Sequence, residues 1–272
     1  MFNRPATQTQ ITHGRRMWLY VLVGLIMFFL IAPSLLVVPL SFSADRYLAF
    51  PPSGWSTRWY AVYLGAIEWR DATYVSFVAA TLTMIVSTVL GTLAAYGMHT
   101  ARSRLMQLAY VAFMLPLIIP GILIAIGIYL FYAKLGLNST MLGIVLAHSV
   151  MAIPLVVITV ASGLKSYDMN QEMVARSLGA SRLWAFLTVT LPQIKIAVIT
   201  GALLAFITSL DEVVISLFIA GAGMSTLTKR MFNALRDEID PTIAAISTLL
   251  LLTSIVLLGM VRLLERKSGR AA

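Results

Sequence analysis

The chain has 272 residues, of which 59% are hydrophobic and only 11% are charged. This composition, with a mean hydropathy of +0.88, lies outside the range of soluble globular domains and places most of the chain in lipid. The absence of cysteine excludes disulfides and thiolate metal sites, and the formal net charge of +9 is not gathered on one face of a soluble domain, so no nucleic acid partner is expected.

Six apolar runs are long enough to cross a bilayer as helices, which takes roughly 18 to 25 residues. They lack the alternating polarity of β-barrel strands. The predicted fold class is therefore an all-α integral membrane protein with six transmembrane helices, with an N-terminal tail 1–16, a membrane domain 17–264 and a C-terminal tail 265–272. The first run could also be a secretory signal, but it is longer than the roughly 7 to 15 residues of a signal core. The six runs are Trp18–Leu40, Thr73–Met98, Leu108–Tyr132, Thr140–Leu164, Ile194–Ala220 and Ile243–Leu264.

The basic residues predict the orientation. If the N-terminus is cytoplasmic, the inside segments hold thirteen of the 20 lysines and arginines and the other side holds the remaining seven. Lysine and arginine are enriched in cytoplasmic loops, so both termini are expected in the cytoplasm. The connection 41–72 then faces outward; with its prolines and tryptophans it predicts an ordered loop or a short interfacial helix.

Span three contains residues that can interrupt a helix, and span four contains a histidine. Pro116, Pro120 and Gly121 lie within span three, where each proline removes a backbone donor and bends the helix. The result is either a simple packing kink or a break beside a cavity, where irregular backbone is tolerated. His148 in span four is either a structural hydrogen-bonding residue or a functional group.

The connection 165–193 faces the cytoplasm and carries capping signals. Asp168 and Gln171 form a capping-box pattern that predicts the start of a short helix. This helix is expected to end at Gly179, since glycine readily adopts the left-handed C-cap conformation. Ser181 can cap a second helix that leads towards Pro192. A helix, a tight turn and a second helix are thus predicted, as a surface hairpin or as a docking element.

The residues from Glu172 to Ser181, followed by Phe186, Val189, Leu191 and Pro192, resemble the EAA loop of MetI-like permeases of binding-protein-dependent ABC importers. Met173 and Val174 replace two small residues of the family pattern, while the glutamate, glycine, leucine and proline are in register. In this family the short helix docks on a cytoplasmic ATPase. The resemblance therefore implies that ATPase coupling involves Glu172, Ala175, Arg176, Leu178, Gly179, Ala180 and Ser181.

The stretch from Ser209 to Gly221, together with 226–227 and 240–245, is similar to the C-type permease subunit of spermidine and putrescine importers. The resemblance covers about Tyr74 to Leu264. It implies a multi-pass permease subunit of the bacterial inner membrane, with a polyamine or similar small organic cation as substrate. Related branches transport aminophosphonates, iron or thiamine. The implied partners are a second permease subunit, two ATP-binding cassette ATPases, a periplasmic substrate-binding protein and membrane lipid, with no cofactor.

Asp211 and Glu212 are adjacent acids inside span five. A charged group deep in a membrane helix costs about 2.5 to 3.5 kcal/mol, so such residues usually face a cavity or a partner. Either at least Asp211 lines a path for a cationic substrate, or the two acids pair with a basic side chain or cap a helix break. The substrate-path candidates are Asp211, Glu212, Pro120 and His148.

No Gly-Lys dipeptide occurs, which excludes the phosphate-binding P-loop, and no His-Glu-x-x-His motif is present. His13, His99 and His148 are too scattered to predict a metal site. The sequence therefore predicts a transport subunit rather than an enzyme, with ATP hydrolysed by another chain. An ion-driven secondary transporter is the alternative, although such proteins commonly contain inverted repeats and none is found. An intramembrane enzyme or assembly factor lacks a catalytic motif.

Overall fold

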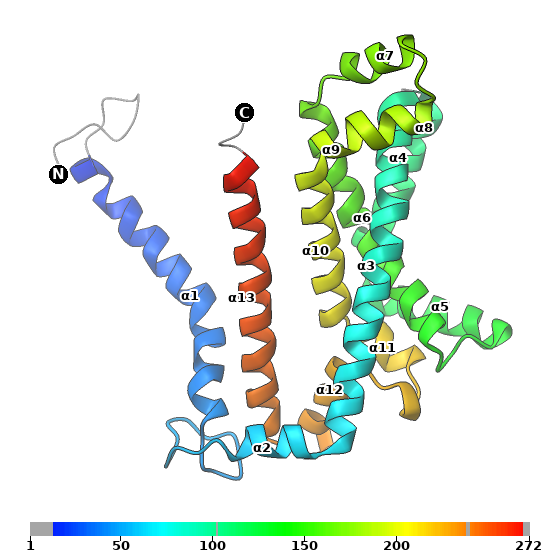
Figure 1. Ribbon diagram of the computed structural model, residues 1–272. Helices are drawn as coiled ribbons and strands as arrows, with labels where there is room; N and C mark the ends of the chain where they lie inside the picture. Colours follow the sequence, from blue (N-terminus) through cyan, green and yellow to red (C-terminus); the bar gives the residue numbers. More distant parts are fainter. Residues whose placement is uncertain (1–12, 102, 238–239, 269–272) are drawn as a thin grey trace. The chain divides into compact units, whose positions relative to one another are not determined.

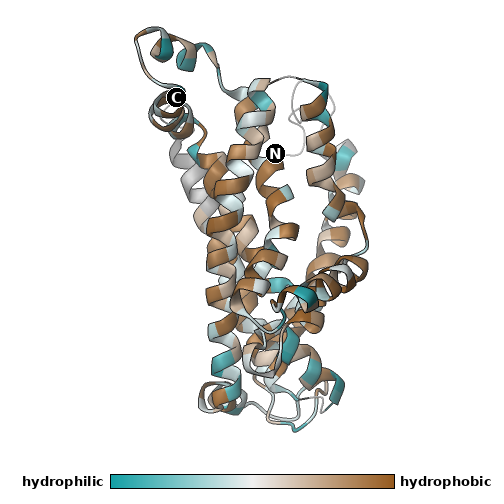
Figure 2. Ribbon diagram, turned by 90° about the vertical axis from the view of Figure 1, so that its right-hand side faces the viewer, coloured by the Kyte–Doolittle hydropathy of each residue, from teal (hydrophilic) through white to brown (hydrophobic). Residues whose placement is uncertain are grey.

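A computed structural model describes residues 13–101, 103–237 and 240–268. The predicted tails therefore lie partly outside the described residues. The chain divides into two compact units, residues 1–63 with 239–252 and residues 64–238 with 253–272. Within the described residues, helices form the regular structure and β-pairing is confined to one isolated bridge, between Ser43 and Trp55. This confirms the all-α fold class. Hydrophobic residues cover the long helices, while hydrophilic residues gather at the helix ends and loops (Figure 2).

The first unit contains a 3-10 turn η1 (His13–Arg16), helix α1 (Met17–Ser41) and most of helix α2 (Arg58–Gly65). Side chains order the loop between the two helices. The indole of Trp59 donates to the Ser43 carbonyl at 3.0 Å, and Ser53 donates to the Asp45 carboxylate through its backbone and its hydroxyl. These bonds from Ser53 hold the pKa of Asp45 below its ordinary value. The sequence predicted an ordered loop or a short helix here, and the structure has both; the outward placement of this connection stays a prediction.

The second unit is built around three helices, α3 (Ile67–Ala101), α6 (Met141–Ser166) and α10 (Lys195–Asp211), which pack against one another (Figure 1). Val156 of α6 lies between two glycines. A Cβ on Gly91 of α3 would lie 2.8 Å from the Val156 Cβ, and a Cβ on Gly201 of α10 would lie 3.3 Å from its Cα. The absence of side chains at these two glycines lets the three backbones approach closely, as in many membrane helix pairs.

Four helices are long and apolar enough to span a membrane, namely α1, α3, α6 and α13 (Thr242–Ser268). Helices α4 (Arg104–Ile118) and α5 (Gly121–Leu135) form a pair bent by 102°, and the segments Arg182–Gln193 and Lys195–Asp211 form a pair bent by 81°. Counting each bent pair as one span gives up to six.

Two predicted spans are interrupted. The run Leu108–Tyr132 is divided between α4 and α5, because Ile119 is extended, with φ −74° and ψ 134°, and Pro120 starts the next helix. A residue before proline is disfavoured in the helical region. The run Ile194–Ala220 is divided where Glu212, also extended, separates α10 from α11 (Val214–Ile219).

The remaining elements are short and lie at the helix ends. Between α6 and α10 come α7 (Asn170–Ser177), α8 (Arg182–Ala185), a π-helix η2 (Phe186–Thr190) and α9 (Leu191–Gln193). A 3-10 turn η3 (Ala222–Met224) and helix α12 (Leu227–Asp237) follow α11. Helix α12 is joined to α3, since the Leu227 amide donates to the Ser76 hydroxyl at 2.7 Å and Arg230 forms an ion pair with Glu68.

Candidate functional site

The loop between α6 and α10 has the predicted order of helix, turn and helix, but the start of its first helix differs from the prediction. The Asp168 carboxylate accepts the Asn170 amide at 3.0 Å, whereas the N-cap of α7 is Met169 and makes no side-chain cap hydrogen bond, so the predicted capping box of Asp168 and Gln171 is not formed. Gly179 follows α7 with φ +97°. The Ala180 amide reaches back to the Ala175 carbonyl at 3.1 Å, which is the closing bond of a glycine C-cap. Ser181 then caps α8 by accepting the Trp184 amide at 3.3 Å. The helix, turn and second helix are confirmed.

Helix α7 presents an apolar outer surface. Val174, and Leu178 directly after the helix, are 59% and 85% exposed, whereas Met173 lines a pocket on the inner side of α7. Large apolar side chains exposed close together on one short segment are costly in water, and such patches usually mark contacts with another molecule. Of the remaining residues that the resemblance assigned to coupling, Arg176, Gly179 and Ser181 are exposed, and the two alanines are partly buried.

Glu172 of α7 points the other way. It is only 1% exposed. The Tyr96 hydroxyl, from α3, donates to its Oε1 at 2.6 Å, and the Thr190 hydroxyl, from η2, donates to its Oε2 at 2.6 Å. A buried carboxylate is tolerated when donors satisfy both oxygens. Glu172 therefore connects α7 to α3 and to the π-helix from within the protein.

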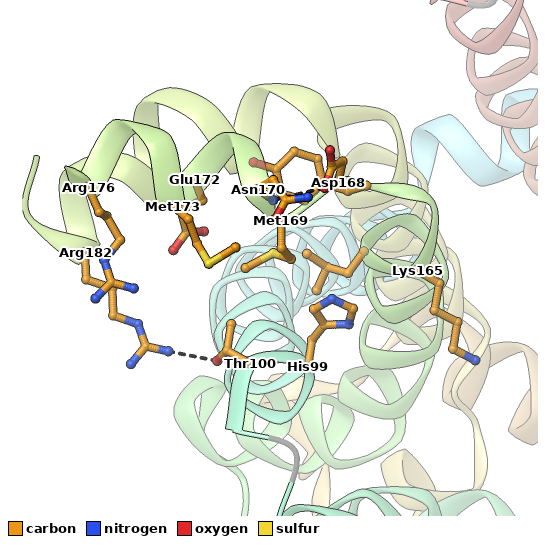
Figure 3. Close-up of a pocket in the computed structure, with 12 residues that line it drawn as sticks. His99, Thr100, Lys165, Asp168, Met169, Asn170, Glu172, Met173, Arg176 and Arg182 are labelled. Atoms are coloured by element: carbon orange, nitrogen blue, oxygen red, sulfur yellow. Dashed lines mark hydrogen bonds between the residues drawn. The ribbon is translucent and has the colours of Figure 1, made fainter. Parts of the chain in front are cut away.

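Arg182 adds a second connection to the same end of α3. Its guanidinium donates to the Thr100 hydroxyl at 2.8 Å (Figure 3). It also lies 5.5 Å from the centre of the Tyr96 ring. The Tyr96 ring also packs against Phe186 of η2, with ring centroids 4.5 Å apart. Helices α7 and α8 and the π-helix are thus all joined to α3 through Tyr96 and its neighbours. A motif search within the loop could not find Tyr96, because no sequence pattern distinguishes it from other aromatics.

The two adjacent acids at the interruption between α10 and α11 differ in how far they are buried. Asp211 is the last residue of α10 and is exposed, whereas Glu212 is partly buried. The Glu212 carboxylate accepts the Ile215 amide at 2.9 Å and so caps the first turn of α11. Its carbonyl accepts the hydroxyls of Ser216 and Thr228 at 3.0 and 3.1 Å. The side chain of Glu212 thus matches the helix-break alternative that the sequence left open.

His148 connects α6 to both sides of this interruption. The residue is 1% exposed, and its ring nitrogens lie 2.8 Å from the Ser209 hydroxyl of α10 and 3.1 Å from the Ser216 hydroxyl of α11. Ser216 links His148 to the Glu212 carbonyl, so these two path candidates belong to one hydrogen-bonded group. Pro120 lies at the other interruption, at the start of α5, which packs against α11.

Lys229 of α12 holds the far end of α11. Its ammonium donates to the carbonyls of Leu217, at 3.3 Å, and Ala220. Burial lowers the pKa of this lysine. Among the described residues, no group of three or more His, Asp or Glu side chains could hold a metal ion.

Comparison with known proteins assigns a family and a fold. The family model for the binding-protein-dependent transport system inner membrane component matches residues 87–270. The chain is 34% identical over 245 residues to the putrescine transport system permease protein PotI of Escherichia coli K12, covering 87% of this chain and 86% of PotI. It is 28% identical over 241 residues to the spermidine/putrescine permease PotC of Haemophilus influenzae, covering 89% of this chain and 93% of PotC.

Two solved structures share the fold. A chain of a bacterial ABC transporter for import of the acidic polysaccharide alginate superposes with a TM-score of 0.66 at 17% identity, covering 92% of this chain and 95% of that chain. A chain of an amino acid ABC transporter gives a TM-score of 0.58 at 16% identity, covering 77% of this chain and 98% of that chain.

Proposed function

Because the chain belongs to the family of binding-protein-dependent transport system inner membrane components, we propose that it is a permease subunit of an ABC importer for polyamines. The family is the one that the EAA-like loop predicted. The observation that supports the mechanism is that α7 has two different sides: one exposes Val174 and Leu178, and the other is joined to α3 through Glu172.

In this proposal the exposed side of α7 docks on a cytoplasmic ATPase subunit, and the buried side carries the displacement to the membrane helices. Leu178 and the exposed Arg176 contact the ATPase. Ala175, Gly179, Ala180 and Ser181 shape the turn that presents them. Glu172 acts from inside, since both carboxylate oxygens are already bonded to Tyr96 and Thr190. ATP hydrolysis takes place on the partner chain.

The interruption between α10 and α11 is the proposed position of the cation path. The C-terminal end of a helix carries partial negative charge, and Asp211 adds a carboxylate at the end of α10. Transporters commonly use the ends of discontinuous helices to bind ions and charged substrates. Putrescine and spermidine are organic cations, which such a site suits. His148, Pro120 and Glu212 keep the two interruptions in place, with Asp211 as the group that attracts substrate.

We further propose six membrane spans with both termini in the cytoplasm of a bacterium, each bent pair of helices counting as one span. Lysine and arginine, thirteen on the inside against seven elsewhere, favour this orientation. A second permease subunit would complete the path. Two ATP-binding cassette ATPases would supply energy, and a periplasmic binding protein would deliver the substrate.

Docking through α7 is tested by Leu178→Asp in the complex reconstituted with its ATPase. A buried charge at an interface centre is costly, so ATPase copurification and substrate-stimulated hydrolysis should fall at least about tenfold. Leu183→Asp is the matched control, since Leu183 is 65% exposed on α8, outside the proposed contact. Equal loss in both variants, or transport by the chain in liposomes without an ATPase, would contradict the proposal; the latter would favour a secondary transporter.

The substrate is tested by uptake with the cognate binding protein present. Putrescine and spermidine should stimulate ATP hydrolysis, and Asp211→Asn should lower polyamine uptake about tenfold, as expected when a charge pairing worth about 1.4 kcal/mol is lost. Stimulation of ATP hydrolysis by an aminophosphonate, ferric iron or thiamine instead would assign the chain to a related branch of the family. Unchanged uptake in Asp211→Asn would remove this residue from the path.

A further inference from the structure

A polar pocket of about 670 Å³ lies beneath α7, between the ends of α3 and α6. Figure 3 shows Arg176 and Arg182 on one side of it, His99 and Thr100 on the floor, and Lys165 extending from the opposite rim. Its charged lining also includes Asp168 and Glu172. Both carboxylates already accept hydrogen bonds from the protein, Asp168 from the Asn170 amide and Glu172 from two hydroxyls.

The charged lining thus consists of three basic side chains, Lys165, Arg176 and Arg182, and two acidic ones, Asp168 and Glu172. Lys165 and Arg176 are exposed, and neither side chain forms an ion pair or hydrogen bond with another residue in the described part of the chain. Arg182 donates to the hydroxyls of Thr100 and Tyr96 and interacts electrostatically with the buried Glu172 carboxylate. Lys165 and Arg176 are therefore the cations of this pocket without an anionic partner among the described residues, which favours an anionic ligand.

A second and larger cavity adjoins the first. It has a volume of about 880 Å³ and lies between α3, α4 and α6. His99 and Lys165 line both cavities. Most of the second lining is apolar or aromatic, and it includes Met98, Met106, Tyr110, Val111, Ile158 and Ala161. A basic pocket at the end of membrane helices therefore continues into an apolar groove that runs along them.

We propose that these two cavities together bind one anionic phospholipid of the cytoplasmic leaflet. The phosphate lies beside Lys165, which lines both cavities, and an acyl chain fills the groove beside Ile158 and Met106. Basic pockets between membrane helices on the cytoplasmic side are typical sites for anionic headgroups. A free phosphate would use the first cavity only, so the adjoining apolar groove favours the lipid. The cytoplasmic placement rests on the proposed function.

Lipid retention by the purified full-length chain tests this site. Phosphatidylglycerol and phosphatidylcholine are offered in equal amounts, and the bound lipid is counted by native mass spectrometry. The wild type should retain phosphatidylglycerol, and Lys165→Gln should retain about fivefold less, because one basic residue near an anionic headgroup contributes about that factor. Lys165→Arg should restore retention. Lys195→Gln, an exposed lysine that lines neither cavity, is the matched control.

The groove is tested separately by Ser162→Trp, since Ser162 lines only the second cavity. This variant should lower phosphatidylglycerol retention while Lys165 is intact. Equal retention of phosphatidylcholine, unchanged retention in Lys165→Gln, or displacement by millimolar inorganic phosphate with no effect of Ser162→Trp would each overturn the proposal. Retention is measured without an ATPase, whereas docking on α7 is measured by ATPase copurification, so either idea can fail without the other.

Discussion

Glu172 lies in a different place from the one that its motif implies. Resemblance assigned it to docking, yet its carboxylate lies inside the protein, between the Tyr96 and Thr190 hydroxyls. A buried carboxylate in water-poor surroundings is stabilised by such donors, and its removal leaves them unpaired. The role proposed for Glu172 is therefore to hold α7 against α3.

Glu172→Ala should lower the free energy of unfolding by about 1 to 3 kcal/mol, since two buried hydroxyls lose their acceptor. Transport should fall while ATPase hydrolysis persists, because docking is kept and its transmission is lost. Thermal unfolding in detergent and the ratio of uptake to hydrolysis measure the two effects. Gln171→Ala, an exposed neighbour on α7, is the control. Unaltered stability would contradict the proposed connection.

Gly179 ends α7 in the left-handed region, at φ +97°, and a Cβ there would meet no atom within 4 Å. Any other residue at this position would therefore be strained by the positive φ angle and not by a clash with neighbouring atoms. Gly179→Val should disfavour the turn by roughly 1 to 2 kcal/mol and lower coupled transport, whereas Gly179→Asn should be milder, since asparagine tolerates this region better. Uptake in vesicles, with membrane insertion as control, measures this. Equal uptake by both variants would speak against the turn as a coupling element.

Among the elements, the two interrupted helix pairs distinguish this chain from a simple bundle. Pro120 separates α4 from α5, and extended Glu212 separates α10 from α11. At the second interruption the Ser216 and Thr228 hydroxyls donate to the Glu212 carbonyl, and the Glu212 carboxylate accepts the Ile215 amide, so side chains replace part of the missing helical hydrogen bonding. Irregular backbone inside a membrane protein is tolerated where such partners satisfy it.

Close packing of α3 on α6 leads to a paired prediction. Gly91→Ala should destabilise the protein by about 1 to 3 kcal/mol, because the added methyl group would lie 2.8 Å from Val156 and force the helices apart. Gly97→Ala on the same helix meets no atom within 4 Å and should be neutral or stabilising, as alanine favours helix over glycine. Thermal unfolding of both variants measures this difference. Similar shifts in melting temperature in the two variants would contradict the close contact.

For the whole molecule, the proposals for ATPase docking, the substrate path and the lipid site all depend on how the chain is oriented in the membrane. The absence of native cysteine means that single cysteines can be introduced without a background. Ser177→Cys on α7 should react with a membrane-impermeant maleimide only in inside-out vesicles, and Thr57→Cys before α2 only in right-side-out vesicles. Both residues are exposed. Reaction of both from the same side would reject the proposed topology.

Much of this architecture was predictable because hydropathy and capping are local. The long spans, the turn at Gly179 and the cap at Ser181 depend on residues close in sequence. The interruptions were harder to predict, since an apolar run at Pro120 reads as one span whether it bends slightly or by 102°. The burial of Glu172 depends on Tyr96, which lies 76 residues away, and no local pattern specifies such a contact.

Val156, which fills the space left by Gly91 and Gly201, has a mechanical consequence. Because Val156 packs closely against both neighbouring backbones, we expect α3, α6 and α10 to move together and not to slide past one another. We then expect the shape changes of a transport cycle to occur at the extended residues Ile119 and Glu212, where the helices are interrupted.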